Sequence, residues 1–446
     1  MASTYLTRTS VTPTNAQKGT ISLWVKRTGL SSTSKGRFFM NHLSSTSYGY
    51  TDFTGGDKLR CAIDDPSTVS IQTNRLFRDT SAWYHIVWSI DTTENTASDR
   101  VKLYVNGVQE TSFQVATYPN QNITLNLFNT SVSNGQVIGS YYTGSSYSGA
   151  FEGLISHYNF IDGTAYPASA FGETDTTTGQ WKINTSPSVT YGNNGFFILK
   201  NGNSLTDQSG EGNDFTLGAG TLTDTKDCPD NVFATLNSLN SWGNTVLTNG
   251  NLTAGNTGTS AGHVSSTMHM NSGKWYMEFN VDTHLTSYSA PVFLLAGTGA
   301  FQQAQVGFNS SGDGSFGIAS NGRSVTDGAD SGSVVIPALV NNDKVQIAYD
   351  ADAGKAWFGI NGTYLNSGNP STGANPYFTS TKLQNNDVAF ILIGYDGNAM
   401  SANFGNGYFG TSAVADNSTA TASTPGTFNY DVPTGYEPLT TKGLNA

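Results

Sequence analysis

The run from Trp83 to Gly107 restricts the possible folds of this chain more than any other stretch. Along its first segment, WYHIVWSID, side chains alternate between two faces, and one face carries Tyr84, Ile86, Trp88 and Ile90. A period of two with one apolar face is typical of a half-buried β-strand, so Trp88 is expected to anchor a core. The second segment, VKLYV, ends in Asn106 and Gly107, a pair that favours the tight turn between antiparallel strands.

The same pattern returns in the second half, in DKVQIAYDADAGKAWFGING. Its second strand, in which Trp357 is the expected core anchor, ends at Asn361 and Gly362. Charged residues make up only 12% of the chain, against a usual share of about 25%, and Gly reaches 50 of 446 residues. Short alternating strands separated by Gly, Ser, Asn and Asp clusters predict an all-β chain: two tandem antiparallel jelly-roll β-sandwiches joined by a turn-rich connector.

The segments TISLWVKR, WYHIVWSID, LYVNG and FEGLISHYNFIDG resemble the concanavalin A-like, laminin-G-like jelly roll. The resemblance covers residues 1–175, and because the matching residues are structural it implies a fold before a function. Residues 176–230 are rich in turn residues and are expected to form a connector, in which Phe196 to Leu199 could add a strand to the first sandwich.

In the second half, SGKWYMEFNVD alternates cleanly and is followed by DVAFILIGY, ANFGNGYF and a closing PTGYEPL. These segments resemble those of a SPRY domain in their order, which implies a second sandwich over residues 231–446. Between the halves, DQSGEGNDFT and CPDNVFATLN resemble the junction found in large virion proteins of marine bacteriophages, where a laminin-G-like domain precedes a second β domain.

Composition limits the classes of partner. The net charge is -11, and the 21 Lys and Arg residues form no run, so nucleic acid is not an expected partner. The longest apolar run, Val388 to Ile393, is shorter than the roughly 20 residues that span a bilayer, so no membrane insertion is expected. The start, MASTYLTRTS, lacks the pattern of a secretory signal peptide, and Cys61 and Cys228 are expected as free buried thiols.

The sequence predicts no catalytic residue, no metal site and no cofactor. Ser260 in GTSAG matches a nucleophile-elbow pattern, but no helical period follows it. Glu278 and Asp282 share one face of a strand, and the ordinary interpretation of such a pair is a solvated strand face rather than the acid and base of a glycosidase. The six histidines are scattered without a familiar metal spacing.

Aromatic residues in polar segments are the candidate binding residues. YYTGSSYSG and STSYGYTDF place tyrosines among Gly, Ser and Thr, where a flat ring with a hydroxyl suits contact with sugar rings or protein surfaces. The alternative is that these rings pack over the ends of the sandwich. The candidates for binding a glycan or partner are Tyr48, Tyr50, Tyr141, Tyr142 and Tyr147.

Three functions remain open from sequence. The first is a non-enzymatic virion protein of a bacteriophage, made in the host cytoplasm: a head-attached fibre, a decoration protein or a tail fibre. Its partners would be other virion proteins and host-surface glycans, with self-association as a trimer left open. The second is a polysaccharide-active enzyme or carbohydrate-binding module of the concanavalin A-like fold. The third is a bacterial surface adhesin, which the missing signal peptide argues against.

Overall fold

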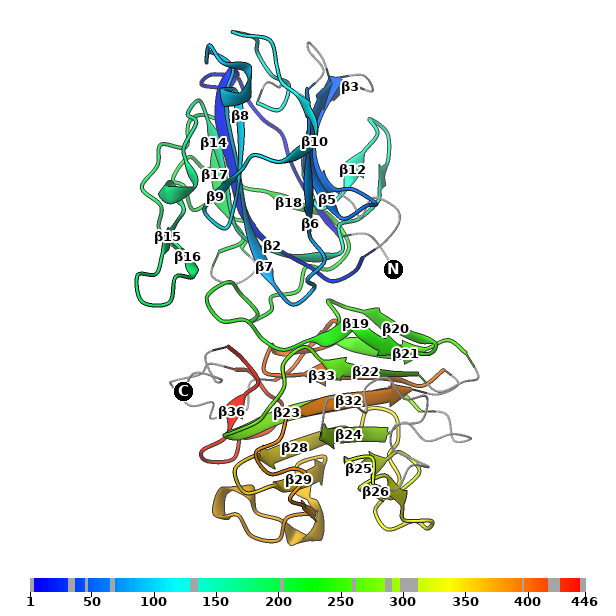
Figure 1. Cartoon of the computed structure of the whole chain (residues 1–446). Coiled ribbons are helices and arrows are strands. Elements are labelled where there is room, and N and C mark those ends of the chain that lie inside the picture. Colours follow the sequence, from blue (N-terminus) through cyan, green and yellow to red (C-terminus); the bar gives the residue numbers. More distant parts are fainter. Residues whose placement is uncertain are drawn as a thin grey trace. The chain divides into compact units, whose positions relative to one another are not determined.

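The structure is a computed structural model that describes residues 4–30, 37–44, 47–64, 69–128, 135–200, 204–258, 262–284, 291–296, 312–394, 397–415 and 426–441. It divides the chain into two compact units, Met1–Asp224 and Thr225–Ala446. Strands dominate both units (Figure 1). The helical segments among the described residues are short 3-10 turns: η1 (Ala97–Asp99), η2 (Ala168–Ala170), η4 (Leu365–Ser367) and η5 (Pro370–Thr372). The predicted all-β class, with antiparallel sandwiches, is confirmed.

The first unit is a sandwich of two antiparallel sheets (Figure 1). The larger sheet has the spatial order β10 (Phe113–Thr117), β6 (Val69–Leu76), β5 (Lys58–Asp64), β4 (Ser47–Phe53), β3 (Arg37–Ser44), β11 (Gln136–Ile138), β1 (Tyr5–Arg8) and β18 (Thr216–Ala219). The smaller has the order β17 (Phe196–Ile198), β14 (Gly153–Asp162), β2 (Lys18–Arg27), β7 (Trp83–Asp91), β8 (Val101–Val105) and β9 (Val108–Glu110). Two hairpins stand apart: β12 (Tyr141–Tyr142) with β13 (Tyr147–Ser148), and β15 (Gly172–Thr174) with β16 (Trp181–Ile183).

The core of the first unit lies between these sheets. Trp88 is fully buried in it, beside Leu103 of β8, and Phe39 of the larger sheet belongs to the same apolar cluster. Asn106 and Gly107 both have positive φ, 47° and 79°, so β8 folds straight back into β9 as the Asn-Gly pair predicted. Trp88 is therefore the core anchor that the alternation of the strand indicated.

The second face of β7 is buried as well, which alternation alone did not indicate. His85 is 1% exposed and stacks between Trp24 and Trp181, at ring-centroid distances of 4.8 and 5.8 Å. Trp181 Nε1 donates to His85 Nδ1 at 2.9 Å, so the other ring nitrogen carries the proton toward Ser22 Oγ, 3.0 Å away. Burial lowers the pKa of His85 to about 3. Residues that follow β14, including Phe171 and Trp181, cover this face.

Residues 176–224, expected to form most of a connector, belong to the first unit. Within them, β17 pairs with β14 and extends the smaller sheet, where the sequence indicates a possible added strand at Phe196 to Leu199. β18 pairs with β1, the first strand of the unit, so the larger sheet is closed by a late segment of the chain. The unit boundary lies at Asp224, well beyond residue 175.

The second unit contains two further sheets (Figure 1). One has the order β19 (Leu236–Trp242), β22 (Gly262–Ser266), β32 (Val388–Gly394), β24 (Pro291–Ala296), β25 (Ser315–Ala319), β26 (Ser324–Thr326) and β27 (Ala329–Asp330). The other has the order β20 (Thr245–Thr248), β21 (Thr253–Asn256), β33 (Ala399–Asn403), β23 (Lys274–Thr283), β28 (Lys344–Asp350), β29 (Lys355–Ile360) and β30 (Thr363–Tyr364). β31 (Phe378–Thr379) pairs with β29, β36 (Glu437–Pro438) runs parallel to β23, and β34 (Tyr408–Phe409) pairs with β35 (Ser412–Ala413).

The second unit buries both faces of the sheet that contains β23. Phe279 and Phe390 stack at 4.0 Å in the main core. On the opposite face, Trp357 is 1% exposed and packs with Tyr436 and other residues of the late segment 426–441. Trp357 is thus buried as predicted, but in this second cluster rather than in the main core.

The expectation of a solvated strand face is wrong for Glu278, which is fully buried. Its carboxylate accepts hydrogen bonds from the backbone N–H groups of Asn429 and Tyr430, both at 2.8 Å, and from the hydroxyl of Tyr276 at 2.9 Å. Burial raises the pKa of Glu278 to about 7. Period two placed this residue outside the main core correctly, but it could not show that a distant segment returns to cover the outer face.

Cys61 and Cys228 form no disulfide. Cys61 is fully buried, and burial raises the pKa of its thiol to about 12, so this sulfur is unreactive at neutral pH. Cys228 is only partly buried.

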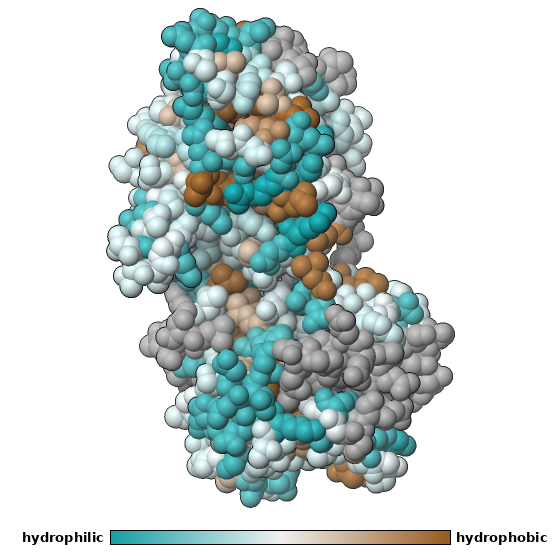
Figure 2. Space-filling view, in the orientation of Figure 1, coloured by the Kyte–Doolittle hydropathy of each residue, from teal (hydrophilic) through white to brown (hydrophobic). Residues whose placement is uncertain are grey.

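In the view of Figure 2, apolar side chains occur in separate patches on a mainly polar surface. The most exposed large apolar side chains include Val334 at 69% and Val108 at 65%. Scattered apolar residues of this kind are ordinary on soluble domains and need no partner to explain them. Among the described residues, no helix has the length and apolar character needed to cross a membrane.

Candidate functional site

The five tyrosines predicted as binding residues lie together on the outer face of the larger sheet of the first unit. Tyr48 and Tyr50 point outward from β4 because Thr51 and Phe53, of opposite parity, are fully buried on the inner side. The β12–β13 hairpin brings in the other three, pairing Tyr142 with Tyr147. These residues occupy strands rather than loops. With one further ring they form the tyrosine cluster: Tyr5, Tyr48, Tyr50, Tyr141, Tyr142 and Tyr147.

Five of the six rings of the tyrosine cluster form two stacks. Tyr147 lies between Tyr5 and Tyr142, with centroid distances of 4.0 and 4.6 Å and interplanar angles of 16° and 28°. Tyr48 and Tyr50 form a second stack at 5.9 Å. Fully buried Met40 and Val137 lie in the same apolar cluster, and the N–H of Tyr142 donates to Met40 Sδ at 3.4 Å. Except for Tyr50, which is 8% exposed, the five predicted rings stay partly open to solvent.

Arg37 joins the two parts of the cluster. Its guanidinium carbon lies 3.8 Å from the ring centroid of Tyr50 and 3.6 Å from that of Tyr141, so the cation is held between two aromatic faces. Its Nε is buried without an acceptor, and none of the ion pairs in the described part of the chain involves Arg37. The site therefore contains a cation that is positioned by rings rather than by a carboxylate.

The neighbouring charged groups, in contrast, are paired. Arg60 makes two hydrogen bonds to Asp52, at 2.9 and 2.6 Å. Burial, aided by a hydrogen bond to Asp64, raises the pKa of Tyr48 to about 12, so this phenol stays protonated in neutral solution. Both acidic groups beside the cluster are therefore engaged within the protein.

His42 lies beneath the β12–β13 hairpin. It is 4% exposed, its ring meets that of Tyr142 edge-on at 4.9 Å, and neither ring nitrogen has a hydrogen-bond partner among the described residues. Burial lowers its pKa, so the ring is neutral at neutral pH. The hairpin above it is polar at its tip, where Thr143 Oγ1 accepts from the N–H of Ser146 at 3.0 Å.

Sequence reasoning missed Tyr5, Arg37 and His42. Tyr5 lies in a short strand whose partner, β18, comes more than 200 residues later, so nothing local shows its neighbours. His42 shares parity with Met40 along β3, which is a usable signal. The register shift between Arg37 and Phe39 breaks that parity, and only the folded sheet shows that Arg37 belongs to the same face.

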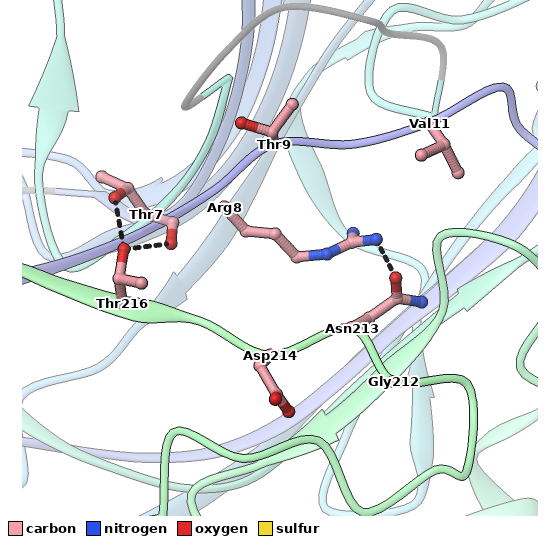
Figure 3. Close-up of a pocket in the computed structure, with 8 residues that line it drawn as sticks. All are labelled: Thr7, Arg8, Thr9, Val11, Gly212, Asn213, Asp214 and Thr216. Carbon is pink, nitrogen blue, oxygen red and sulfur yellow. Dashed lines mark hydrogen bonds between the residues drawn. The ribbon is translucent and has the colours of Figure 1, made fainter.

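A pocket of about 340 Å³ lies elsewhere in the first unit, between β1 and residues 212–216 (Figure 3). Arg8 crosses it and donates to Gln136 Oε1 at 2.6 Å, to the carbonyl of Asn194 and to Asn213 Oδ1. Asp214 points away from Arg8 and accepts from the N–H of Asp207 at 2.7 Å. These hydrogen bonds link β1 to later segments of the unit, so the polar residues of this pocket have a structural role.

The carboxylates that share a strand face in the sequence, Glu278 and Asp282, are each held by hydrogen bonds within the second unit. Glu278 is covered by the late segment 426–441, and Asp282 accepts from Ser401 Oγ at 2.5 Å. Ser260 lies outside the described residues. No group of three or more His, Cys, Asp or Glu side chains able to hold a metal ion occurs in the part of the chain that the structure describes.

Comparison with known families matches residues 2–169 to the concanavalin A-like lectin/glucanases superfamily. The match covers the N-terminal part of the first unit, where the sequence resembled the laminin-G-like jelly roll. No curated protein matches this chain.

Similar solved structures include the SPRY domain of human HERC1, with 11% identity and a TM-score of 0.30. The match covers 37% of this chain and 96% of the HERC1 chain. A pentraxin from Limulus polyphemus has 14% identity and a TM-score of 0.27, and the match covers 36% of this chain and 71% of the pentraxin chain. Domain 4 of the arabinanase AbnA from Geobacillus stearothermophilus, solved with arabinotriose, has 19% identity and a TM-score of 0.26, covering 35% and 65%. Likenesses this slight leave the function of the present chain open.

Proposed function

We propose that this chain is a non-catalytic glycan-binding protein and that the tyrosine cluster is its binding site. The observation that carries the proposal is the assembly of five tyrosines, from segments about 90 residues apart, into one partly exposed cluster of aromatic rings. An aromatic face offers flat apolar contact to the C–H face of a sugar, while phenol groups and the polar hairpin tip offer hydrogen bonds to its hydroxyls. The match of residues 2–169 to a lectin and glucanase superfamily supports binding of saccharide. Binding without cleavage is proposed because the carboxylates of Glu278 and Asp282 are held by hydrogen bonds within the second unit.

The tyrosine proposal predicts loss of glycan retention when Tyr141, Tyr142 and Tyr147 are changed together to alanine. The variant removes the hairpin rings that cover Met40 and stack on Tyr5, so both contact area and the shape of the site are lost. The measurement is retention on immobilised host-surface polysaccharide, with reducing sugar assayed in parallel. We expect retention by the parent protein without release of sugar, and a loss of at least about tenfold in affinity in the variant.

A matched control is Tyr104→Ala, which removes a partly buried tyrosine from the outer face of the other sheet. It is expected to retain glycan like the parent. Circular dichroism of each variant would establish that the sandwich is intact. Cleavage by the parent would overturn the non-catalytic proposal, and unchanged retention in the triple variant would remove the cluster from the site.

We further propose that the protein works on a bacteriophage particle, as a fibre or decoration component. This part rests on the resemblance of DQSGEGNDFT and CPDNVFATLN to a junction in phage virion proteins. Many copies on one particle would turn weak individual sites into useful avidity, provided that they can engage together. Immunogold labelling of purified particles is expected to show the protein at the head or the tail. Its absence from particles, by labelling and by mass spectrometry, would reject the virion role and leave the binding site untouched.

A further inference from the structure

We infer that the ligand of the tyrosine cluster is an acidic saccharide, one that carries a carboxylate or a sulfate group. The inference rests on the proposed function, because it names the chemical class of glycan that the same site would take. Its basis is the position of Arg37, whose guanidinium is held at 3.8 and 3.6 Å from the rings of Tyr50 and Tyr141.

The arginines of the first unit differ in the groups that their guanidinium groups contact. Arg60 has the carboxylate of Asp52, and buried Arg27 has that of Asp57 at 3.0 Å. Arg8 donates to three neutral oxygens. Arg37 has two aromatic faces and, among the described residues, no hydrogen-bond acceptor or carboxylate. A positioned cation without an anion is the complement of an anionic ligand.

The acidic side chains beside the tyrosine cluster, Asp52 and Asp64, are engaged by groups other than Arg37. Asp52 is its cross-strand neighbour in β4, yet both carboxylate oxygens of Asp52 accept from Arg60, at 2.9 and 2.6 Å. Asp64 accepts from the phenol of Tyr48. His42, beneath the hairpin, contributes no charge at neutral pH because burial lowers its pKa. The charge left for a ligand is therefore that of Arg37.

The overall acidity of the chain does not oppose this ligand. Of the 21 Lys and Arg residues, 14 lie in residues 1–224, together with 17 of the 32 Asp and Glu residues. The first unit therefore has a formal charge of only about -3 of the total of -11, and the second unit carries the rest. Long-range repulsion of an anionic polymer would come mainly from the second unit, and salt screens it over about 8 Å at physiological ionic strength.

Guanidinium suits this task better than ammonium would. Its flat shape allows stacking between two rings while its edge still offers N–H groups in a fork that matches carboxylate or sulfate oxygens. The surrounding tyrosines would contact the sugar ring that carries the acid. Removal of one charge-assisted contact of this kind is expected to lower affinity at least about tenfold.

The test compares three immobilised polymers: polygalacturonate for the carboxylate, dextran sulfate for the sulfate, and dextran as a neutral control. Retention of the full-length protein, its Arg37→Gln variant and its Arg75→Gln variant is measured in low and high salt. Arg75 is a fair control because it lies on the same sheet, 49% of its side chain is exposed, and its partner is Glu110. We expect the parent to bind one acidic polymer at least about tenfold more tightly than dextran, the Arg37 variant to lose that preference, and the Arg75 variant to keep it.

The outcomes separate the inference from the function on which it rests. Retention on dextran that depends on the three hairpin tyrosines but not on Arg37 would overturn the acidic ligand and leave glycan binding in place. Retention on an acidic polymer that Arg37→Gln does not change would also overturn it, as non-specific charge attraction. No retention on any polymer, and none on host polysaccharide, would remove both. Arg37→Lys, which keeps the charge but not the fork, is expected to lie between parent and Gln variant, and this guards against a loss caused by repacking of Tyr50 and Tyr141.

Discussion

Replacing Trp88 by alanine is expected to lower the free energy of unfolding of the first unit by about 3 to 5 kcal/mol. The indole is fully buried in the core between the two sheets, so its removal loses buried apolar area and leaves a cavity that rigid strands cannot fill. Its Nε1 has no hydrogen-bond partner in the part of the chain that the structure describes, so the cost comes from packing rather than from a lost hydrogen bond. Differential scanning calorimetry should show one transition moving to lower temperature while the transition of the second unit stays in place.

Trp242→Ala is the matched control for this variant. Trp242 is 37% exposed and lies in the second unit, so the same substitution should cost less and should not alter the transition of the first unit. A Trp88 variant that melts like the parent protein would mean that the indole is not in the core.

Stability of the second unit is expected to fall as pH rises, because of Glu278. Burial raises the pKa of this carboxyl from its usual 4.5 to about 7 in the folded chain. Between these values the folded state binds more protons than the unfolded state, so the free energy of unfolding decreases with pH and levels off above pH 7. A shift of this size corresponds to about 3 kcal/mol over the window. Urea unfolding of the second unit at pH 5 and at pH 8 measures it.

The variant Glu278→Gln isolates this effect. The amide keeps an oxygen for one of the donors from Asn429 and Tyr430 but cannot ionise, so the fall in stability between pH 5 and pH 8 should shrink by about 3 kcal/mol. Asp282→Asn is a useful comparison because burial also raises the pKa of Asp282, a residue that is less covered. If the parent and the Gln variant show the same dependence on pH, the buried carboxyl is not the group responsible.

The strands that sequence predicted are those whose partners are near in the chain. The alternation of apolar residues and the Asn-Gly pair predicted β7, β8 and the turn into β9. Both signals depend on only a few consecutive residues. The predicted end of the first domain, residue 175, precedes the unit boundary at Asp224 because β18 forms a strand only by pairing with β1, at the other end of the unit. Local composition shows turn residues there and cannot show a pairing over that distance.

Only part of the candidate site could be predicted from the sequence. Tyrosines placed among Gly, Ser and Thr drew attention to the two segments that meet, although the sequence did not show that they meet. Arg37 was not visible, because its meaning depends on two rings from different segments, Tyr50 and Tyr141. The prediction for Glu278 was wrong for a related reason. The backbone N–H groups that bind its carboxylate belong to Asn429 and Tyr430, which follow it by 151 and 152 positions in the sequence. Contacts of this kind belong to the fold and leave no local pattern.

The pairing of each unit's late segment with its early one affects the order in which the protein can be made. Thr7 and Thr216 meet across β1 and β18, and the N–H of Val232 donates to Thr441 Oγ1; both pairs are 209 residues apart in sequence. Nearly all of a unit must therefore be synthesised before its early and late segments can pair. Until then, the edge of β1 that pairs with β18 has no partner strand. Synthesis offers the first unit time to close while the second is being translated. Until its own late segment has been synthesised, the second unit is likewise open to pairing with a neighbouring copy.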